Sequence, residues 1–262
     1  MRAVALHEDV VVVTSAAWKA SGVLVRSAGE AFLIDCPILP DELEALPALA
    51  REAGFAVRGL LVTHVDWDHV LGRYAFPEAS LAVAETSAAR LAAEPGAAQR
   101  ELRDDFDDVW YVSRPAPLSL PGAQALPVPG VVEIGSGELR LHPADGHTAD
   151  GMAIEIPWAG VLACGDYLSP VEIPMISPGG SIGAYRATLR RFEPLVAEAS
   201  TVIPGHGGPI DSARAAEILE QDLAYLDALE SGGAGVPLPE GRRTREQRRI
   251  HAENAGQATD PR

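Results

Sequence analysis

The feature that most constrains this chain is a dense cluster of polar side chains directly after an apolar run. Residues 59–63 predict a short buried strand. Four potential metal ligands follow at once: His64, Asp66, Asp68 and His69. Alternation along an extended segment places His64, Asp66 and Asp68 on one side. Two carboxylates about 4 Å apart repel by roughly 4 kcal/mol at an effective dielectric constant of about 20, and a divalent cation removes that cost. The cluster therefore predicts a metal site at the end of a strand.

Three further donors stand in loops that follow apolar runs. They are His147 in a Gly-His-Thr sequence, Asp166 in Cys-Gly-Asp, and His206 in Pro-Gly-His-Gly. A site built on strand ends requires this placement, and imidazole with carboxylate donors suits zinc, iron or manganese. Asp35, at the end of another predicted strand, is expected either to hydrogen-bond a metal ligand or to cap a turn.

The order of apolar segments predicts an α/β fold in a single domain of 262 residues. Two successive halves, each with strands followed by helices, favour a sandwich over a strictly alternating parallel sheet. A proline-rich insertion is expected near residues 95–130, and a short helical tail at 236–262. The predicted strands lie within 10–36 and at 59–63, 81–84, 139–141, 152–156, 161–164 and 201–203. The predicted helices are 41–53, 86–93, 189–199, 211–230 and 242–254.

The ordered motifs resemble those of the metallo-β-lactamase superfamily. Its signature is HxHxDH, followed by a lone His, an Asp after Gly, and a His in a PGHG-like turn; the likeness runs from about residue 20 to about residue 230. The resemblance implies an αββα sandwich with two divalent metal ions at one edge, zinc being the first expectation. It assigns His64, Asp66 and His147 to one ion, Asp68, His69 and His206 to the other, and Asp166 as the bridge.

One position departs from the signature, because its second His is Asp66 here. Two divalent ions, one hydroxide and two aspartates sum to a charge of about +1, and Asp66 lowers the sum to about 0. We therefore expect a weaker Lewis acid, a less acidic bound water, and tolerance for iron or manganese. Replacing Asp66 with His should move the acidic limb of the pH profile to lower pH. The alternative is a drifted site that binds little metal.

The predicted reaction is hydrolysis of a small ester, thioester, lactone or lactam by a metal-bridging hydroxide. Asp68 and Asp166 are the expected catalytic residues, and Asp68 would also orient the hydroxide. Tyr167, Tyr185 and His251 are candidate substrate contacts. Alternatives on the same fold are an iron-dependent oxidoreductase similar to sulfur dioxygenases, and a phosphodiesterase. A metal-bound protein without catalytic activity is a further alternative.

Composition narrows the partners to a small-molecule substrate. A net charge of -16 disfavours nucleic acid, whose binding depends on Lys and Arg. No apolar stretch approaches the roughly 20 residues of a membrane span, and no basic, cleavable start is evident, so we expect a cytoplasmic protein. Two cysteines imply no disulfide framework. The arginines between 242 and 249 are expected on a solvated helix face. Nothing in the sequence sets the oligomeric state.

Overall fold

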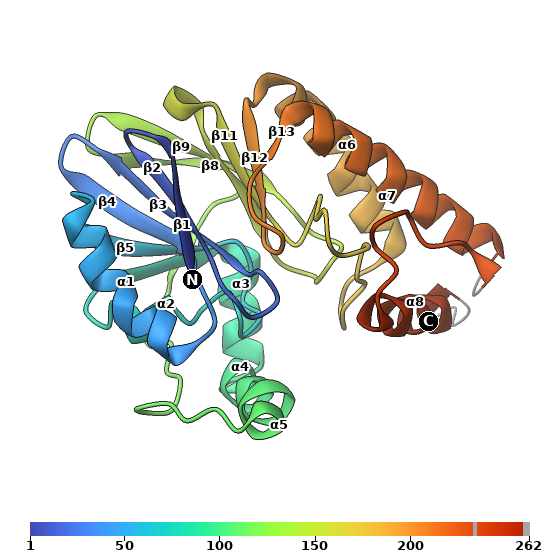
Figure 1. The fold of residues 1–262 in the computed structure, drawn as a ribbon, viewed down its shortest axis with the longest axis horizontal. Helices are drawn as coiled ribbons and strands as arrows, with labels where there is room; N and C mark the ends of the chain where they lie inside the picture. Colours follow the sequence, from blue (N-terminus) through green and yellow to red (C-terminus); the bar gives the residue numbers. More distant parts are fainter. Residues whose placement is uncertain (233–234, 259–262) are drawn as a thin grey trace.

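The computed structural model describes residues 1–232 and 235–258, in which two β-sheets lie between two layers of helices (Figure 1). This is the αββα arrangement that the resemblance implied. Each sheet faces the other sheet on one side and helices on the other. The strands at the centre of each sheet are therefore apolar on both faces, whereas strands near the edges are partly exposed.

The first sheet has seven strands in chain order from β1 to β7. Neighbours from β1 to β4 are antiparallel, because short turns connect them. Neighbours from β4 to β7 are parallel, because helical crossovers return the chain to the same edge. The strands are β1 (Arg2–His7), β2 (Val10–Thr14), β3 (Ser21–Ser27), β4 (Glu30–Asp35), β5 (Val57–Val62), β6 (Ser80–Ala84) and β7 (Gln124–Leu126).

The second sheet has six strands in the order β13-β12-β11-β10-β9-β8. Only the pair β11 and β12 is parallel within it. The long helix between those two strands makes the crossover that a parallel pair needs. The strands are β8 (Gly130–Ile134), β9 (Gly137–Pro143), β10 (Met152–Ile156), β11 (Val161–Gly165), β12 (Thr201–Pro204) and β13 (Ile210–Asp211).

Two pairs of helices form the outer layers (Figure 1). Helices α1 (Pro40–Glu52) and α2 (Gly72–Ala75) cover the first sheet, whereas α6 (Ile182–Glu198) and α7 (Ser212–Gly232) cover the second. The remaining helices are α3 (Glu85–Ala93), α4 (Ala97–Glu101), the π-helix η1 (Leu102–Asp107), α5 (Asp108–Trp110), the 3-10 helix η2 (Pro157–Ala159) and α8 (Arg245–Ala258). None of the described helices is long and apolar enough to cross a membrane.

Strand β2 shows how one run of valines fills two layers. Val10 and Val12 point to the cluster between the sheets, where they join residues such as Ile154 of β10. Val11 and Val13 point the other way, into the cluster that includes the buried face of α1. Each buried valine contributes about 1.5–3 kcal/mol relative to an exposed one. A third cluster joins β11 and β12 to α6, α7 and α8.

Residues 95–130 are more regular than the expected insertion. They contain α4, η1 and α5, and then β7, which forms the edge of the first sheet. Leu102 and Phe106 are buried in the cluster of that sheet. Their spacing of four residues suits a helix, but aspartates at 104, 105, 107 and 108 surround them and obscure the pattern in the sequence.

Two helices near the carboxyl end also differ from the sequence prediction. Helix α6 begins at Ile182 rather than at residue 189. The glycines at 179, 180 and 183 suggest a loop, yet the Ser181 hydroxyl accepts a hydrogen bond from the Ala184 N–H and caps the helix. Helix α8 runs from Arg245 to Ala258 rather than over the predicted 242–254. Of the predicted tail 236–262, residues 259–262 are outside the described residues.

Candidate metal centre

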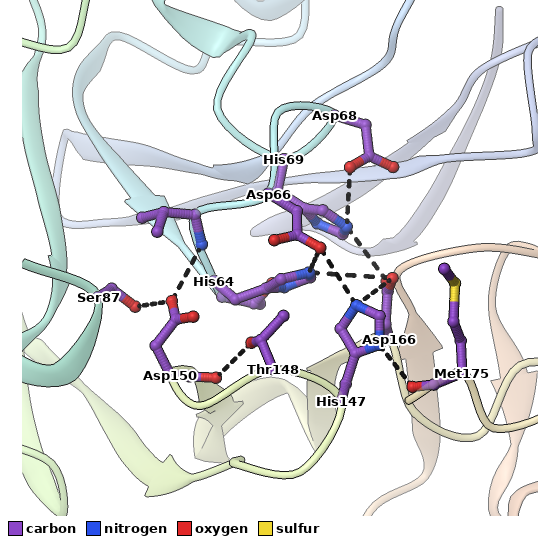
Figure 2. A network of polar contacts seen from close by, with 12 residues as sticks. His64, Asp66, Asp68, His69, Ser87, His147, Thr148, Asp150, Asp166 and Met175 are labelled. Carbon is purple, nitrogen blue, oxygen red and sulfur yellow. Dashed lines mark hydrogen bonds and ion pairs between the residues drawn. The ribbon is translucent and has the colours of Figure 1, made fainter. Parts of the chain in front are cut away.

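The predicted donors all follow strands that end at one edge of the sandwich. The loop 64–69 comes directly after β5, His147 follows β9, Asp166 follows β11, and His206 follows β12. Figure 2 shows the side chains from the first sheet and those from the second pointing toward each other. The structure therefore brings together donors that lie up to 142 residues apart in sequence, from His64 to His206.

Three overlapping sets of two histidines and one aspartate have donor atoms within 4.8 Å of one another, and two of these sets, the first and second groups, share no residue. In the first group, Asp66 Oδ2 lies 3.6 Å from His64 Nε2 and 3.4 Å from His147 Nε2. In the second group, Asp68 Oδ2 lies 3.2 Å from His206 Nε2, and Asp68 Oδ1 lies 3.9 Å from His69 Nε2. These are the two sets that the resemblance assigned to separate ions.

Asp166 stands between the two groups and offers one oxygen to each. Its Oδ2 lies 3.4 Å from His147 Nε2 and 3.9 Å from His64 Nε2. Its Oδ1 lies 3.1 Å from His69 Nε2 and 3.5 Å from His206 Nε2. A carboxylate in this position can ligate two ions at once.

Unpartnered buried atoms show that the donor set fits metal ions. The Nε2 atoms of His64, His69 and His147 and the Oδ1 atom of Asp166 are buried and have no hydrogen-bond partner. Buried polar groups are nearly always satisfied, and each unsatisfied one costs about 1–3 kcal/mol. Four such atoms facing one another are explained by divalent cations that accept their lone pairs, so the residues present fit two ions.

Ion pairs among the donors shift the pKa values of their side chains. Burial would raise the pKa of Asp166, but the charges of His206 and His69 outweigh burial and hold it well below its usual value. Burial lowers the pKa of His147, yet its contact with the Asp66 carboxylate and the charge of Asp166 raise it to about 9. For His206, the charges of Glu172 and Asp166 outweigh burial and raise the pKa to about 10. Because these imidazole pKa values are raised in the absence of metal, divalent ions would have to compete with protons for the histidine nitrogens.

The second group is held by neighbours from the first sheet and its loops. His69 Nδ1 lies 3.0 Å from Asp35 Oδ2, and Asp35 also accepts hydrogen bonds from the N–H and hydroxyl of Thr63. His206 Nδ1 lies 3.1 Å from the carbonyl oxygen of Trp18. These contacts fix the ring orientation, so that Nε2 is the nitrogen left for a metal. Of its two expected roles, Asp35 takes the one of supporting a ligand.

The first group is held by different segments, and two of its supporting residues were not foreseen from the sequence. His147 Nδ1 lies 2.8 Å from the carbonyl oxygen of Met175. Arg90 of α3 donates to Asp66 Oδ1 at 2.7 Å and to Asp150 Oδ1 at 2.9 Å. The available signal was that α3 follows β6, the neighbour of β5, at the edge where the ligand loop begins. The positive charge of Arg90 and the negative charge of Asp150 cancel, so together they leave the net charge expected for the metal centre unchanged.

Gly205 shows why the turn before His206 carries a glycine. A Cβ atom at this position would lie 2.2 Å from Asp166 Oδ1 and 2.9 Å from the ring of His69. Any side chain would therefore displace the carboxylate of Asp166. The glycine is required by this close approach between the two halves of the site.

The two candidate tyrosines do not line an open pocket, because Tyr167 is 2% exposed and Tyr185 is 1% exposed. The Tyr167 hydroxyl accepts a hydrogen bond from the N–H of His147, and the Tyr185 hydroxyl donates one to the carbonyl oxygen of Asp166. Their predicted role in substrate contact is therefore corrected. They support the ligand loops from behind.

The carboxyl-terminal segment departs from expectation at Arg242, whereas the substrate contact expected of His251 stays a prediction. His251 on α8 is half-buried, and its Nδ1 lies 3.0 Å from the hydroxyl of Tyr225 on α7. Arg242, predicted on a solvated face, is fully buried and donates to Asp222 at 2.5 Å. The expectation is therefore wrong for Arg242 alone, since Arg243, Arg245, Arg248 and Arg249 are exposed.

Comparison with known proteins agrees with the geometry. Residues 17–206, which include all seven donors, match the model of the metallo-beta-lactamase superfamily. A hydroxyacylglutathione hydrolase of Cereibacter sphaeroides is 28% identical over 216 residues, which cover 82% of this chain and 72% of that protein.

Solved structures share the fold at low sequence identity. A metallo-beta-lactamase family protein of Thermus thermophilus has a TM-score of 0.66 at 24% identity, covering 95% of this chain and 92% of its own. A metallo-beta-lactamase from Pontibacter korlensis has a TM-score of 0.62 at 16% identity, covering 86% and 98%. With the matched region, the sandwich and the order of the donors taken together, this chain belongs to the metallo-beta-lactamase superfamily and is a metallohydrolase.

Proposed function

We propose that the protein hydrolyses a small ester, thioester, lactone or lactam at a centre of two divalent ions, with zinc as the first expectation. The observation that carries this proposal is the position of Asp166, whose two oxygens face two separate groups of donors. The 28% identical hydroxyacylglutathione hydrolase supports including thioesters among the substrates. Bound divalent ions would polarise the scissile carbonyl and activate water for attack.

The side chains of this chain supply the remaining parts of the mechanism. Burial would raise the pKa of Asp68, but the charges of His69 and His206 lower it, so the carboxylate is ionised at neutral pH. An ionised Asp68 can accept a hydrogen bond from the attacking water and orient it toward the carbonyl. Asp166 would keep the two ions in register. No serine or cysteine nucleophile is needed for this reaction.

An aromatic cluster beside the ligand loop offers an apolar surface to the substrate. The rings of Trp18, Trp67 and Phe106 pack with centroids 5.2–5.3 Å apart. Trp18 is 44% exposed, and its backbone carbonyl contacts His206 of the second group. A partly apolar acyl or leaving group would bury against such a ring, as in most small-molecule sites.

The test combines metal content with a substrate panel. The purified protein should contain two divalent ions per chain and should turn over at least one ester, thioester, lactone or lactam without oxygen. Asp166→Asn should abolish turnover, whereas the exposed control Asp104→Asn should not change it. No turnover in a protein with both sites loaded would contradict the proposal.

The carboxylate at Asp66 favours one alternative specifically. Carboxylate ligands suit iron and manganese better than a purely imidazole set does. Iron in the protein, with oxygen consumed during turnover, would indicate an oxidoreductase rather than a hydrolase. Turnover of phosphodiesters alone would instead indicate a phosphodiesterase.

A further inference from the structure

We infer that Arg90 is a positioning residue for the first metal ion, because it fixes which oxygen of Asp66 faces that ion. The inference rests on the proposed metal centre. Neither the superfamily motifs nor the pattern of the sequence includes Arg90, which lies on α3, outside the loops that carry the donors.

The contacts of Asp66 divide its two oxygens between two tasks. Oδ1 accepts a hydrogen bond from Arg90 at 2.7 Å. Oδ2 faces the Nε2 atoms of His64 and His147 at 3.6 and 3.4 Å. With Oδ1 turned toward Arg90, Oδ2 is the oxygen that faces the first ion. Arg90 therefore prevents the carboxylate from rotating or from chelating the ion with both oxygens.

Arg90 is itself held by a buried carboxylate that is tied to the site. Its Nη1 lies 2.9 Å from Asp150 Oδ1, and Asp150 is 2% exposed. Asp150 Oδ2 accepts hydrogen bonds from the Ser87 hydroxyl at 2.6 Å and from the N–H of Val65 at 3.2 Å. One carboxylate thus joins α3 to the ligand loop. Figure 2 shows the Ser87 and Asp150 contacts beside the donors.

Three histidines of the site are held in the same way as Asp66. His69 Nδ1 contacts Asp35, His147 Nδ1 contacts a backbone carbonyl, and His206 Nδ1 contacts another. In each case the atom that does not face the metal is anchored, and such anchors set the geometry of the ligand. Asp66 needs a donor as its anchor, because its free atom is an acceptor. Arg90 supplies that donor.

The chemistry of the anchor predicts which substitutions are compatible. In Asp66→His, an imidazole that gives one nitrogen to the metal carries a proton on the other. That N–H would face the guanidinium of Arg90, so two donors would oppose each other. Asp66→His combined with Arg90→Gln would place a carbonyl oxygen opposite the N–H and remove the conflict.

The experiment measures zinc content and zinc affinity in each variant, by dialysis against a competing chelator. Arg90→Met should weaken binding of one ion by about 10–100-fold and leave the other ion bound. Arg90→Lys should recover part of this loss. The matched control is Arg186→Met, because Arg186 also forms ion pairs with acidic side chains and its side chain is 20% exposed, against 21% for Arg90.

Comparison of Asp66→His with the double variant Asp66→His and Arg90→Gln gives a second readout that does not depend on the stability of Arg90→Met. Asp66→His alone should bind the first ion more weakly than Asp66→His with Arg90→Gln. Unchanged binding of both ions in Arg90→Met, or equal losses in the single and double variants, would overturn the role of Arg90. Absence of zinc binding in the unmodified protein would instead overturn the proposed metal centre.

Discussion

The two donor groups have the same composition, yet they are held by different parts of the molecule. The second group, Asp68, His69 and His206, is anchored by Asp35 at the end of β4 and by the loop before β3. The first group, His64, Asp66 and His147, is anchored by α3 and by the loop that follows β11. The aspartate of the first group is also more exposed, at 20% against 10%.

The anchor of His147 depends in turn on the carboxyl-terminal helix. The Asn254 side chain of α8 donates to the carbonyl oxygen of Pro174 and accepts from the N–H of Ile176. These two residues flank Met175, whose carbonyl holds the His147 ring. The supports of the first group therefore extend to α8, whereas those of the second group come from the first sheet and its loops. We expect the first ion to be the easier one to lose.

The largest effect should come from removing the residue that the groups share. Asp166→Ala takes one oxygen from each group and leaves the four imidazoles without a common partner. Both ions should bind more weakly by more than the about 100-fold that an anchoring residue contributes. Metal content after dialysis measures this, and loss of one ion alone would show that Asp166 is not a bridge.

Asp35→Ala should be the counterpart of the Arg90 variants, acting on the second group. It leaves the Thr63 N–H and the His69 ring without their buried acceptor. Each of these two unsatisfied hydrogen-bond donors should reduce the free energy of unfolding by about 1–3 kcal/mol. Chemical unfolding of the metal-free protein measures this loss. In a zinc titration the second ion should weaken by about 10–100-fold. Preferential loss of the first ion would contradict the assignment of Asp35 to the second group.

Asn254→Ala should act on the first group from a distance. Removing this fully buried side chain leaves two backbone groups unsatisfied, which should reduce the free energy of unfolding by about 2 kcal/mol. Zinc affinity of the first group should fall by about tenfold, with the second group unchanged. The control is Arg249→Ala on the same helix, whose exposed ion pairs contribute less than about 1 kcal/mol. Equal weakening of both ions would argue against a specific path through Met175.

The smallest difference between the groups concerns protons. The pKa of His147 is raised to about 9 and that of His206 to about 10, from ordinary values near 6.5. Because these folded-state values are raised, the ion pairs of the metal-free protein stabilise it fully below pH about 6.5 and are lost as pH rises through 9 and 10. Zinc binding at neutral pH should therefore release protons. As pH rises, this release should diminish at a lower pH for the first group, because the pKa of His147 is lower than that of His206. Calorimetry in buffers of different ionisation enthalpy measures it; zero release at neutral pH would contradict these values.

The donors could be named from the sequence because each follows a strand closely. Polar residues after apolar runs are local signals, and the resemblance ordered them into two groups. The anchors could not be named in the same way. Arg90 resembles any charged residue on a helix, and only the packing of α3 beside the ligand loop brings it to Asp66, 24 residues away. Tyr167 and Tyr185 show the converse, since an aromatic residue near a predicted ligand suggests a pocket wall, whereas both side chains are buried.

The sequence by itself determined the sandwich class, the seven donors and the departure at Asp66, because strand periodicity and residue type at strand ends are local properties. The tertiary structure alone decided that one oxygen of Asp66 faces the histidines while Arg90 holds the other, and that α8 reaches His147 through Asn254 and Met175. These features depend on contacts between residues far apart in the sequence, such as Asn254 and the carbonyl oxygen of Pro174, which are 80 residues apart. Such contacts are set by the packing of layers rather than by any one segment.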